Sequence, residues 1–539
     1  MPRSLADKTK SLIDSLYKPL SFWERAARHR IVTLALISQA GDAAAIPHIA
    51  SLLLDRNLEV ASAALNAIQS LIQALSPTDL PWLEQISRRS SPYWRLYPAS
   101  WVEMTPDQVD QLRNLGAASA VALGLATFHN SGYVRQTALR MLADADDGTE
   151  LPYLLLRLND WVPVVKDTAD SMVRTRLIKR YAALLVGNIA LVERLRIAVR
   201  GRKQEIVHAI DDFLRSTDGQ QAIKAGLDSP DKHIKRACYR LAFDLQGRDR
   251  ALIIEEAISD SDPTIRLRGV KESSSLDTAL MTRFLSGARN DRIPSVRREA
   301  LRVCSERLTD LANSWLKQAL LDSSPLVRGY AQFELGKGSA FDLRRFYLEE
   351  LEAGDSANLY SALSGLGEAG SSEDAEIAMS QISHEAPKIR RAAIRALAQL
   401  RADRFADVFE YCLSDCAPSV SWEARKGLCR TLHLVIAERV WEIFSTETEL
   451  HIRRNALFVI SRLSKWESIS YLVEALGSNV EGLRNLAGQY VTRWQRQFNR
   501  SFPSPTRMQV ERLSVALDRP ASELTVSIRK QLEWFIAKR

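Results

Sequence analysis

Several features are scarce or missing in this sequence, and each absence argues against a class of protein. The 539 residues contain 5 cysteines, an odd number without the spacing of a small disulfide-linked scaffold. The longest clearly apolar run near the N-terminus, residues 31–37, is far shorter than the roughly 20 residues that span a bilayer. Residues 1–23 lack the apolar stretch of a signal peptide. We therefore expect a cytoplasmic protein with reduced thiols and no membrane insertion.

The motifs of common enzyme classes are also missing. There is no glycine-rich phosphate loop with its lysine, no His-Glu-x-x-His helix and no nucleophile elbow. Cys412, Cys416, Cys429 and His433 imitate zinc spacing, but the repeat described below places Cys429 on the order of 15 Å from the turn that holds Cys416. We therefore expect no catalytic residues, no cofactor and no metal, and no enzymatic activity.

What is present is an ordinary folded composition, with 46% hydrophobic and 26% charged residues. A chain of this length exceeds one hydrophobic core, so it must divide into domains or extend as a repeat array. The net charge of +8 permits an acidic partner, but it is modest for 539 residues. Composition alone therefore selects neither an architecture nor a partner.

One pattern recurs along most of the chain. It reads Asp, a Pro-containing turn, Val or Ile, a basic residue, and a small residue four places after the Val or Ile, as in Asp322, Pro325, Val327, Arg328 and Ala331. The Val or Ile positions, here called register positions, lie 31 residues apart in the best copies. The register positions are Val60, Val134, Val165, Ile234, Ile265, Val296, Val327, Ile389, Val420, Ile452 and Leu483.

Each part of this pattern has a physical reason in a helical hairpin. The Asp can accept hydrogen bonds from amides that the next helix leaves unpaired. A proline two places before the register residue loses no intrahelical bond there, so it marks the start of a second helix. The small residue lets neighbouring helices approach closely. One hairpin cannot bury its apolar faces alone, so adjacent hairpins must stack.

These residues resemble HEAT repeats, specifically the short bacterial kind that includes the HEAT-like repeats of phycobilin lyase subunits. The resemblance covers roughly residues 60–487 and is weakest over 76–116 and 173–223. It implies an all-α, armadillo-type fold: an α-α superhelix, or HEAT/ARM-type α-solenoid, of helical hairpins with a period of about 31 residues. It is specific for the fold and unspecific for function.

The basic residue after each register position forms a row of its own. In the family, this residue and the turn Asp usually form a ladder between successive repeats. The matching residues are Arg135, Lys166, Lys235, Arg266, Arg297, Arg328, Arg390, Arg453 and Arg484. Ala61 and Ser421 depart from the pattern. Such a row also resembles a phosphate-binding stripe, but we favour the structural ladder.

The period divides the chain into seven predicted segments. They are an N-terminal helical cap (1–40), a first HEAT-like repeat (41–75), an aromatic and Pro-rich non-periodic insertion (76–116), HEAT repeats (117–172), an irregular basic helical segment (173–223), regular HEAT repeats (224–495) and a C-terminal helical cap (496–539). Function is expected where the period breaks, because regular repeats describe architecture.

The two breaks supply the candidate binding residues. In the insertion, Trp94, Arg95, Tyr97 and Trp101 have the composition of a protein-binding anchor, although they would also serve to pack the insertion onto the solenoid. The basic segment offers a patch for phosphates or an acidic partner, although a solvated helix face is the alternative. The residues of this predicted basic patch are Arg174, Arg176, Lys179, Arg180, Arg194, Arg196, Arg200, Arg202 and Lys203.

Three functions remain open. The leading one is a non-catalytic scaffold or adaptor that binds a protein partner along an extended surface. The second is a nucleic-acid-binding HEAT protein, either a phosphate-backbone binder or one resembling the HEAT-like DNA-repair glycosylases. The third, suggested only by the repeat subtype, is a bilin lyase-type subunit. A basic groove on the concave face would favour nucleic acid, whereas an apolar or mixed groove would favour protein. The oligomeric state is left open.

Overall fold

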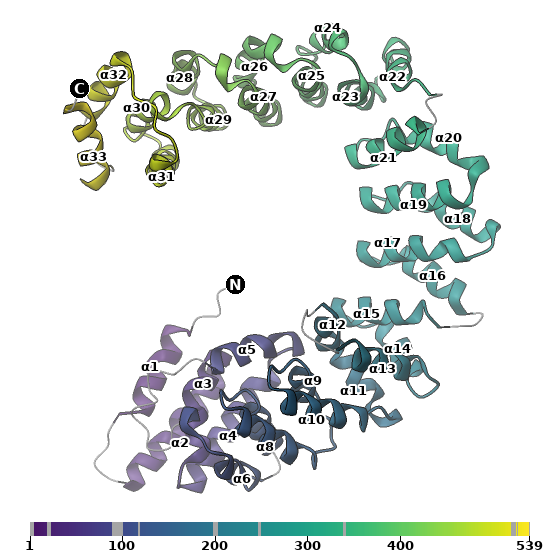
Figure 1. Cartoon of the computed structure of the whole chain (residues 1–539), viewed down its shortest axis with the longest axis vertical. Helices are drawn as coiled ribbons and strands as arrows, with labels where there is room; N and C mark the ends of the chain where they lie inside the picture. Colours follow the sequence, from purple (N-terminus) through teal and green to yellow (C-terminus); the bar gives the residue numbers. More distant parts are fainter. Residues whose placement is uncertain are drawn as a thin grey trace. The chain divides into compact units, whose positions relative to one another are not determined.

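A computed structural model describes residues 5–18, 23–88, 101–116, 119–197, 203–245, 249–337, 341–518, 524 and 526–537. These residues form α-helices, short 3-10 segments and turns, and no strand occurs among them (Figure 1). They fall into two compact units, Met1–Leu276 (unit 1) and Asp277–Arg539 (unit 2). The predicted all-α architecture of helical hairpins is confirmed.

The helices of unit 1 are α1 (Asp7–Leu16), α2 (Trp23–Ala40), α3 (Ile46–Ile49), α4 (Leu58–Gln73), α5 (Leu80–Ser87), α6 (Pro106–Arg113), α7 (Ser119–Ala126), α8 (Gly132–Leu142), α9 (Leu151–Arg157), α10 (Pro163–Arg174), α11 (Ala182–Gly187), α12 (Ile189–Ile197), α13 (Lys203–Arg215), α14 (Gln220–Leu227), α15 (Lys232–Ala242), α16 (Asp249–Ser259) and α17 (Pro263–Glu272). Its 3-10 segments are η1 (Ala43–Ala45), η2 (Ala50–Leu54), η3 (Pro77–Asp79), η5 (Trp101–Glu103), η6 (Lys179–Tyr181) and η7 (Ser273–Ser275).

The helices of unit 2 are α18 (Thr278–Ala288), α19 (Pro294–Arg307), α20 (Thr309–Ala319), α21 (Pro325–Gly336), α22 (Leu343–Glu352), α23 (Leu359–Ala369), α24 (Ala375–Met379), α25 (Pro387–Leu400), α26 (Ala406–Leu413), α27 (Pro418–Arg430), α28 (Ala437–Thr446), α29 (Leu450–Ile460), α30 (Lys465–Ala475), α31 (Glu481–Gln497), α32 (Arg507–Asp518) and α33 (Val526–Ala537). Its 3-10 segments are η8 (Ser372–Asp374), η9 (Ala402–Phe405), η10 (Leu432–Leu434) and η11 (Phe498–Arg500).

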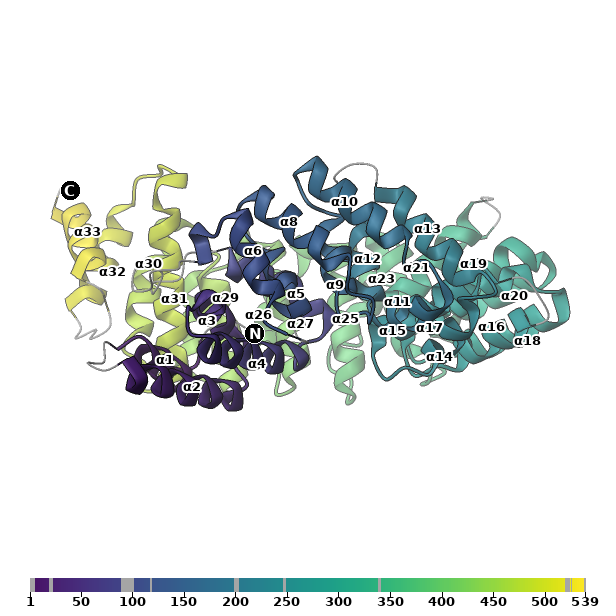
Figure 2. The same cartoon turned by 90° about the horizontal axis from the view of Figure 1, so that it is seen from below.

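Each repeat is a hairpin of two helices that stacks on the next hairpin. In unit 2 the second helices of successive hairpins (α19, α21, α23, α25, α27, α29 and α31) form one row, here called the second-helix row, on the inner side of the curved unit (Figure 1). The first helices from α18 to α30 form the outer, first-helix row. In unit 1, α5, α9, α12, α15 and α17 follow one another across the unit (Figures 1 and 2).

The small residues four places after the register positions are buried where helices meet. Ala138 in α8, for example, is 0% exposed, and α8 packs against α6, α7 and α10. The same 0% exposure is found at Ala64, Ala169, Cys238, Ala300, Ala331, Ala393, Ala424, Ala456 and Ala487. Close helix packing therefore explains why these positions are small.

Enlarging one of these alanines is expected to force two hairpins apart. Ala138→Leu should lower the free energy of unfolding of unit 1 by about 1–3 kcal/mol, because extra methylenes in a filled core displace side chains and backbone. The matched control is Ala183→Leu in α11, where the alanine is exposed. Urea unfolding followed by circular dichroism measures both. Equal midpoints for the two variants would contradict this account of the small position.

The predicted ladder is present at Arg135, Lys235, Arg297 and Arg390, whereas Arg328 pairs with Glu368 and Arg453 donates to the carbonyl of Phe444. Arg297 donates from Nη1 to the carbonyl of Asp291, six residues earlier (2.7 Å), and from Nε and Nη2 to the carboxylate of Asp322, 25 residues later (2.7 Å each). The Asp of one repeat thus meets the arginine of the repeat before it. The same 25-residue pairing joins Arg135 to Asp160, Lys235 to Asp260 and Arg390 to Asp415. These cations are occupied within the stack and fix the register of successive hairpins.

Ser421, one of the two predicted departures, shows how the ladder is replaced. Its buried hydroxyl donates to the carbonyl of Leu413 (2.6 Å) and accepts from Asn455 Nδ2 (2.8 Å). A ring nitrogen of His451 lies 3.1 Å from the carbonyl of Asp415, the position that an arginine would hold. Side chains of the following repeat therefore satisfy the groups that the serine cannot reach.

Among the described helices, none is by itself long and apolar enough to cross a membrane. Only α4 and the segment Pro77–Ser87 reach that threshold together, as a pair bent by 108°.

Candidate functional site

The structure disperses the predicted basic patch. Carboxylates neutralise three of its arginines: Arg174 pairs with Asp170, Arg176 with Glu150 and Arg180 with Asp146. Arg176 is buried, and its Nη2 also donates to the carbonyls of Ala143 (3.3 Å) and Ala145 (2.8 Å). Lys179 is exposed at the start of η6. This half of the patch is mostly structural.

The other half of the patch centres on α12. Arg196 donates from Nη2 to Asp211 (2.8 Å), whereas Arg194 is exposed and has no ion-pair partner among the described residues. The segment with Arg200 and Arg202 lies outside the described residues, as does the side chain of Lys203. Arg194 and Lys179 are therefore the patch residues whose charges have no ion-pair partner within the described part of the chain, and Arg194 is the one on α12.

The predicted aromatic anchor has one described member. Trp101 in η5 is 6% exposed, and its carbonyl oxygen lies 2.9 Å from Nε2 of His129. This side chain packs the insertion onto unit 1 and offers little surface to a partner. Trp94, Arg95 and Tyr97 lie outside the described residues.

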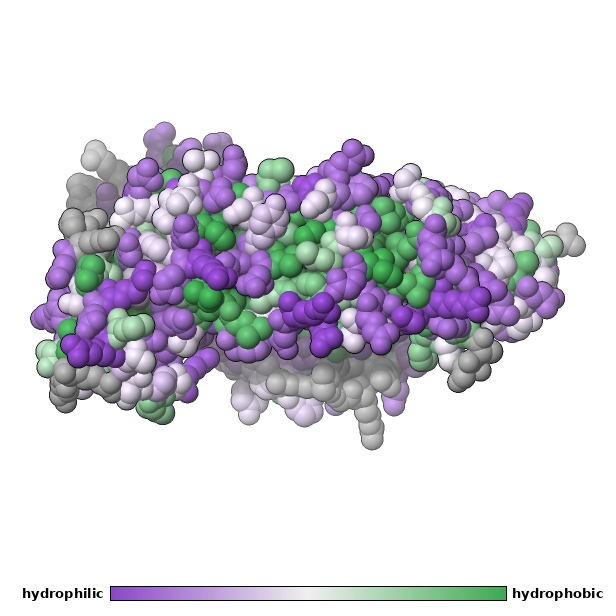
Figure 3. All heavy atoms as spheres, turned by 90° about the horizontal axis from the view of Figure 1, so that it is seen from above, coloured by the Kyte–Doolittle hydropathy of each residue, from purple (hydrophilic) through white to green (hydrophobic). Residues whose placement is uncertain are grey.

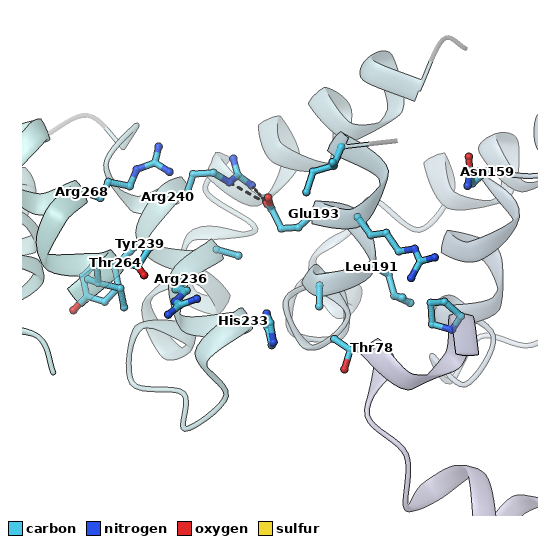
Figure 4. A pocket seen from close by; sticks show the side chains of 16 residues that line it. Thr78, Asn159, Leu191, Glu193, His233, Arg236, Tyr239, Arg240, Thr264 and Arg268 are labelled. Carbon is cyan, nitrogen blue, oxygen red and sulfur yellow. Dashed lines mark hydrogen bonds and ion pairs between the residues drawn. The ribbon is translucent and has the colours of Figure 1, made fainter. Parts of the chain in front are cut away.

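A groove of about 700 Å³ lies beside Arg194 in unit 1 (Figure 4). Its apolar floor is made of buried residues from three helices: Leu191 on α12, Ala237 and Tyr239 on α15, and Ile265 on α17. Arg236, Arg240 and Arg268 line one side, and Thr78 and Asn159 the other (Figure 4). We call this hollow the unit 1 groove.

The groove is basic and partly apolar. Four arginines line it, with Glu193 as the one acidic residue. Arg240 donates to Glu193 (2.7 Å from Nη2) and to Asp211 (3.0 Å from Nη1). Arg236 donates to Asp262 through Nε (2.6 Å) and Nη2 (3.1 Å). The remaining rim combines Arg194 with Ile197, whose side chain is 82% exposed. An apolar anchor beside a free cation is thus the principal feature of this surface.

The arginines beside the groove lower the pKa of a carboxylate that contacts them, Asp211. Burial raises the pKa of Asp211, but hydrogen bonds and attraction from Arg240 and Arg196 outweigh it, so the pKa lies below its ordinary value. A depressed folded-state pKa contributes stability that is present above the unfolded pKa of about 3.9 and is lost as the pH falls through the folded pKa.

We therefore expect Asp211→Asn to destabilise unit 1 at neutral pH. The difference in stability between the variant and the wild type should become smaller as the pH falls. Melting temperatures measured between about pH 7 and pH 3 test this, because the wild type loses the contribution of Asp211 over that range. A gap that stayed constant down to the acid limit would contradict the assigned pKa direction.

A second, smaller hollow extends the groove toward an exposed tryptophan. Trp161 is 57% exposed, and the guanidinium groups of Arg88 and Arg135 lie 4.2 and 4.4 Å from its ring centroid. The hollow of about 170 Å³ beside it shares Arg194 and Leu191 with the unit 1 groove. Tryptophan and arginine are the side chains that most often dominate binding energy at protein interfaces.

Trp161 was not singled out from the sequence, although a signal existed. It lies four residues before a register position, where other repeats carry Ser261, Ser323, Glu385 or Cys416. A large aromatic in a turn that is elsewhere small or polar breaks the pattern.

Among the residues whose positions are described, no three His, Cys, Asp or Glu side chains gather so that they could hold a metal ion.

Comparison with known proteins assigns the chain to no family. No family model matches the chain, and no curated protein does. A crystal structure of importin beta aligns over 98% of this chain and 78% of its own, with 12% identity and a TM-score of 0.34. The fold is a HEAT/ARM-type α-solenoid. The Kap95:Nup1 complex aligns with the solenoid over 98% of this chain and 86% of its own (9% identity, TM-score 0.32).

The Schizosaccharomyces pombe (S. pombe) condensin Cnd3-Cnd2 subcomplex aligns over 99% of this chain and 82% of its own, with 12% identity and a TM-score of 0.33. At such identities and TM-scores, these structures carry no argument about the partner or activity of the solenoid. The functional argument rests on its own residues.

Proposed function

We propose that the solenoid is a non-catalytic scaffold that binds a protein partner in the unit 1 groove. The observation that carries this proposal is the combination of an apolar floor, the exposed Ile197 and the unpaired Arg194 on one helix. A mixed groove of this kind favours a protein partner, because apolar anchors surrounded by polar groups are typical of protein interfaces.

The groove also indicates the chemistry of the bound segment. A side chain of Leu, Ile or Phe type would cover Ile197 and the floor, and a neighbouring carboxylate would pair with Arg194. Trp161 lines the adjoining smaller hollow, which shares Leu191 and Arg194 with the groove, and would contact the next part of the segment. We therefore propose an acidic segment with an apolar anchor as the partner.

Site-specific photo-crosslinking tests this proposal. A photoreactive phenylalanine analogue at position 197, in the full-length tagged protein, should yield discrete protein adducts that survive nuclease treatment. Arg194→Glu in the same chain should abolish them, and Ile197→Asp should weaken binding of the identified partner by about 2 kcal/mol, roughly 30-fold.

The matched control places the same analogue at Leu252 in α16. Leu252 is 59% exposed and lies outside the groove lining. Identical adducts from positions 197 and 252 would contradict a binding groove, as would adducts that disappear with nuclease. Comparing the adducts from positions 197 and 252 distinguishes a specific binding site from nonspecific binding to exposed aliphatic residues.

Two finer expectations belong to the same proposal. The repeat subtype is proposed to be the short bacterial kind similar to that of phycobilin lyase subunits, and the location is proposed to be cytoplasmic. The spacing of the repeats and the reduced cysteines support them, with all 5 thiols free in the structure.

A further inference from the structure

Charge is segregated between the two helix rows of unit 2. The helices α25, α27, α29 and α31 of the second-helix row carry twelve Lys or Arg residues and two Asp or Glu residues. Their partners α24, α26, α28 and α30 carry two Lys or Arg residues and seven Asp or Glu residues. Figure 3 looks onto the first-helix side, where hydrophobic residues gather in patches among hydrophilic ones. From α25 to α31, the second-helix row is therefore the more basic of the two rows, and we call this part of it the basic face.

Aromatic rings and cations alternate across this basic face in direct contact. From α23 to α25, the Tyr360 hydroxyl accepts a hydrogen bond from Arg391 Nη2 (3.4 Å). From α27 to α29, the Arg425 guanidinium lies 4.3 Å from the Phe458 ring centroid. The Phe458 ring lies 6.4 Å from that of Tyr490 on α31.

The remaining contacts make these steps continuous. Arg395 on α25 donates to Glu423 on α27 (2.7 Å), and Lys426 donates to the same carboxylate (2.9 Å). The Nζ of Lys426 lies 4.7 Å from the ring centroid of Trp422, which is 43% exposed. We call this set the aromatic–basic track; its members are Tyr360, Arg391, Arg395, Trp422, Arg425, Lys426, Phe458, Tyr490 and Arg493.

Positive charge on the track is poorly compensated. Arg425 has no carboxylate within ion-pair distance among the described residues, and its buried Nε has no hydrogen-bond acceptor. Burial is the main reason that the pKa of Arg425 lies below its ordinary value. At the α31 end, the track opens into a hollow of about 820 Å³ lined by Arg493, Arg496 and Arg500, with no acidic residue in its lining.

We propose that the aromatic–basic track binds a single-stranded nucleic acid. Arginines of α25 to α31 and the basic hollow would hold phosphates, and bases would stack on the exposed face of Trp422 and beside Tyr490. Charge complementarity alone would also suit an acidic polypeptide. The alternation of rings with guanidinium groups favours nucleic acid, because every base has a face that stacks on an aromatic ring.

Fluorescence anisotropy with labelled oligothymidylate and oligouridylate of about 20 nucleotides tests this proposal on the full chain. The wild type should bind with an affinity that falls steeply between about 50 and 200 mM salt. Arg493→Glu with Arg496→Glu should weaken binding more than tenfold and flatten the salt dependence, since each phosphate contact contributes to the slope. Trp422→Ala should weaken binding about tenfold through lost stacking.

The matched control is the double reversal Arg404→Glu with Arg439→Glu. Both arginines are exposed in the segment from η9 to α28, on the first-helix side, and the net charge change is the same. Equal weakening by the control and the test pair would overturn the proposal, as would absence of binding at about 50 mM salt.

Two further ligands complete the experiment: polyglutamate as a competitor, and a nucleic-acid duplex of the same length as the single strand. Full competition by polyglutamate together with a silent Trp422→Ala variant would assign the track to an acidic polypeptide and overturn the proposal. Tighter binding of the duplex than of the single strand would do the same. Crosslinking from position 197 in unit 1 is unaffected by any of these variants, so failure here is distinct from failure of the proposed scaffold function.

Discussion

Asp160→Asn is expected to destabilise unit 1 by about 3–5 kcal/mol, because it leaves two buried guanidinium groups without their shared carboxylate. Asp160 accepts from Arg135 Nε (2.8 Å) and Nη2 (2.7 Å) and from Arg157 Nη1 (2.9 Å). The side chains of Asp160 and both arginines are almost completely buried. Water cannot replace the lost contacts at such a site. Because Arg157 also pairs with Glu84, the uncompensated charge falls mainly on Arg135.

Urea unfolding followed by far-ultraviolet circular dichroism measures this loss. Because solenoids unfold in segments, the transition assigned to unit 1 is the relevant one. Asp144→Asn is the control: Asp144 pairs with Arg113 on the surface (2.8 Å), and exposed pairs of this kind contribute about 0–1 kcal/mol. An Asp160 variant as stable as the Asp144 variant would contradict the assignment of Asp160 as the centre of a buried network.

The repeat architecture was predictable because one packing rule acts at every copy. A small residue at Ala300 or Ala331 and an arginine at Arg297 solve the same steric and electrostatic problem each time. Their recurrence every 31 residues is visible without any long-range information. The ladder followed for the same reason, since Asp160, Asp322 and Asp415 each stand 25 residues after an arginine of the preceding repeat.

The candidate sites were less predictable because they depend on contacts between distant segments. Arg176 and Arg180 looked unpaired in a basic stretch, but Glu150 and Asp146 reach them from the turn before α9. Arg196 likewise meets Asp211 from the next helix. Local sequence shows which charges are near in the chain, whereas the compensation of a charge depends on neighbours brought close by stacking.

The aromatic–basic track was also not predictable from local sequence, because it is formed by residues of several repeats. Arg391 and Trp422 stand two places after their register positions, and Arg395, Lys426 and Phe458 stand six places after them. Each copy looks like an ordinary solvated helix face. The alignment of these positions across helices makes one surface, and that surface becomes apparent only when the residues are compared by their place in the repeat rather than along the chain.

Arg328→Ala is expected to cost about 3–5 kcal/mol in unit 2, for a reason specific to its position. The ladder has no regular partner here, so fully buried Arg328 pairs instead with Glu368 on α23, 40 residues away (Nη2–Oε1 2.5 Å), and holds the carbonyl of Asp322 (2.7 Å). Gln332 donates to Glu368 and to the Tyr347 hydroxyl (3.1 Å each). Removing Arg328 leaves Glu368 without its cation, with the Gln332 amide as the remaining donor, and takes a donor from the carbonyl of Asp322 in the join between α21 and α23.

Denaturation of unit 2 should then separate into two stages, with the α22 to α31 segment outlasting α18 to α21, because nearest-neighbour interfaces set the cooperativity of a solenoid. The double variant Arg328→Met with Glu368→Leu should regain most of the lost stability, since apolar side chains of similar volume can replace a buried ion pair at little cost. If the double variant were less stable than Arg328→Ala, the cost would come from packing at α21 rather than from an uncompensated charge. Recovery in the double variant would show that the pair defines how the hairpins join and adds little net stability.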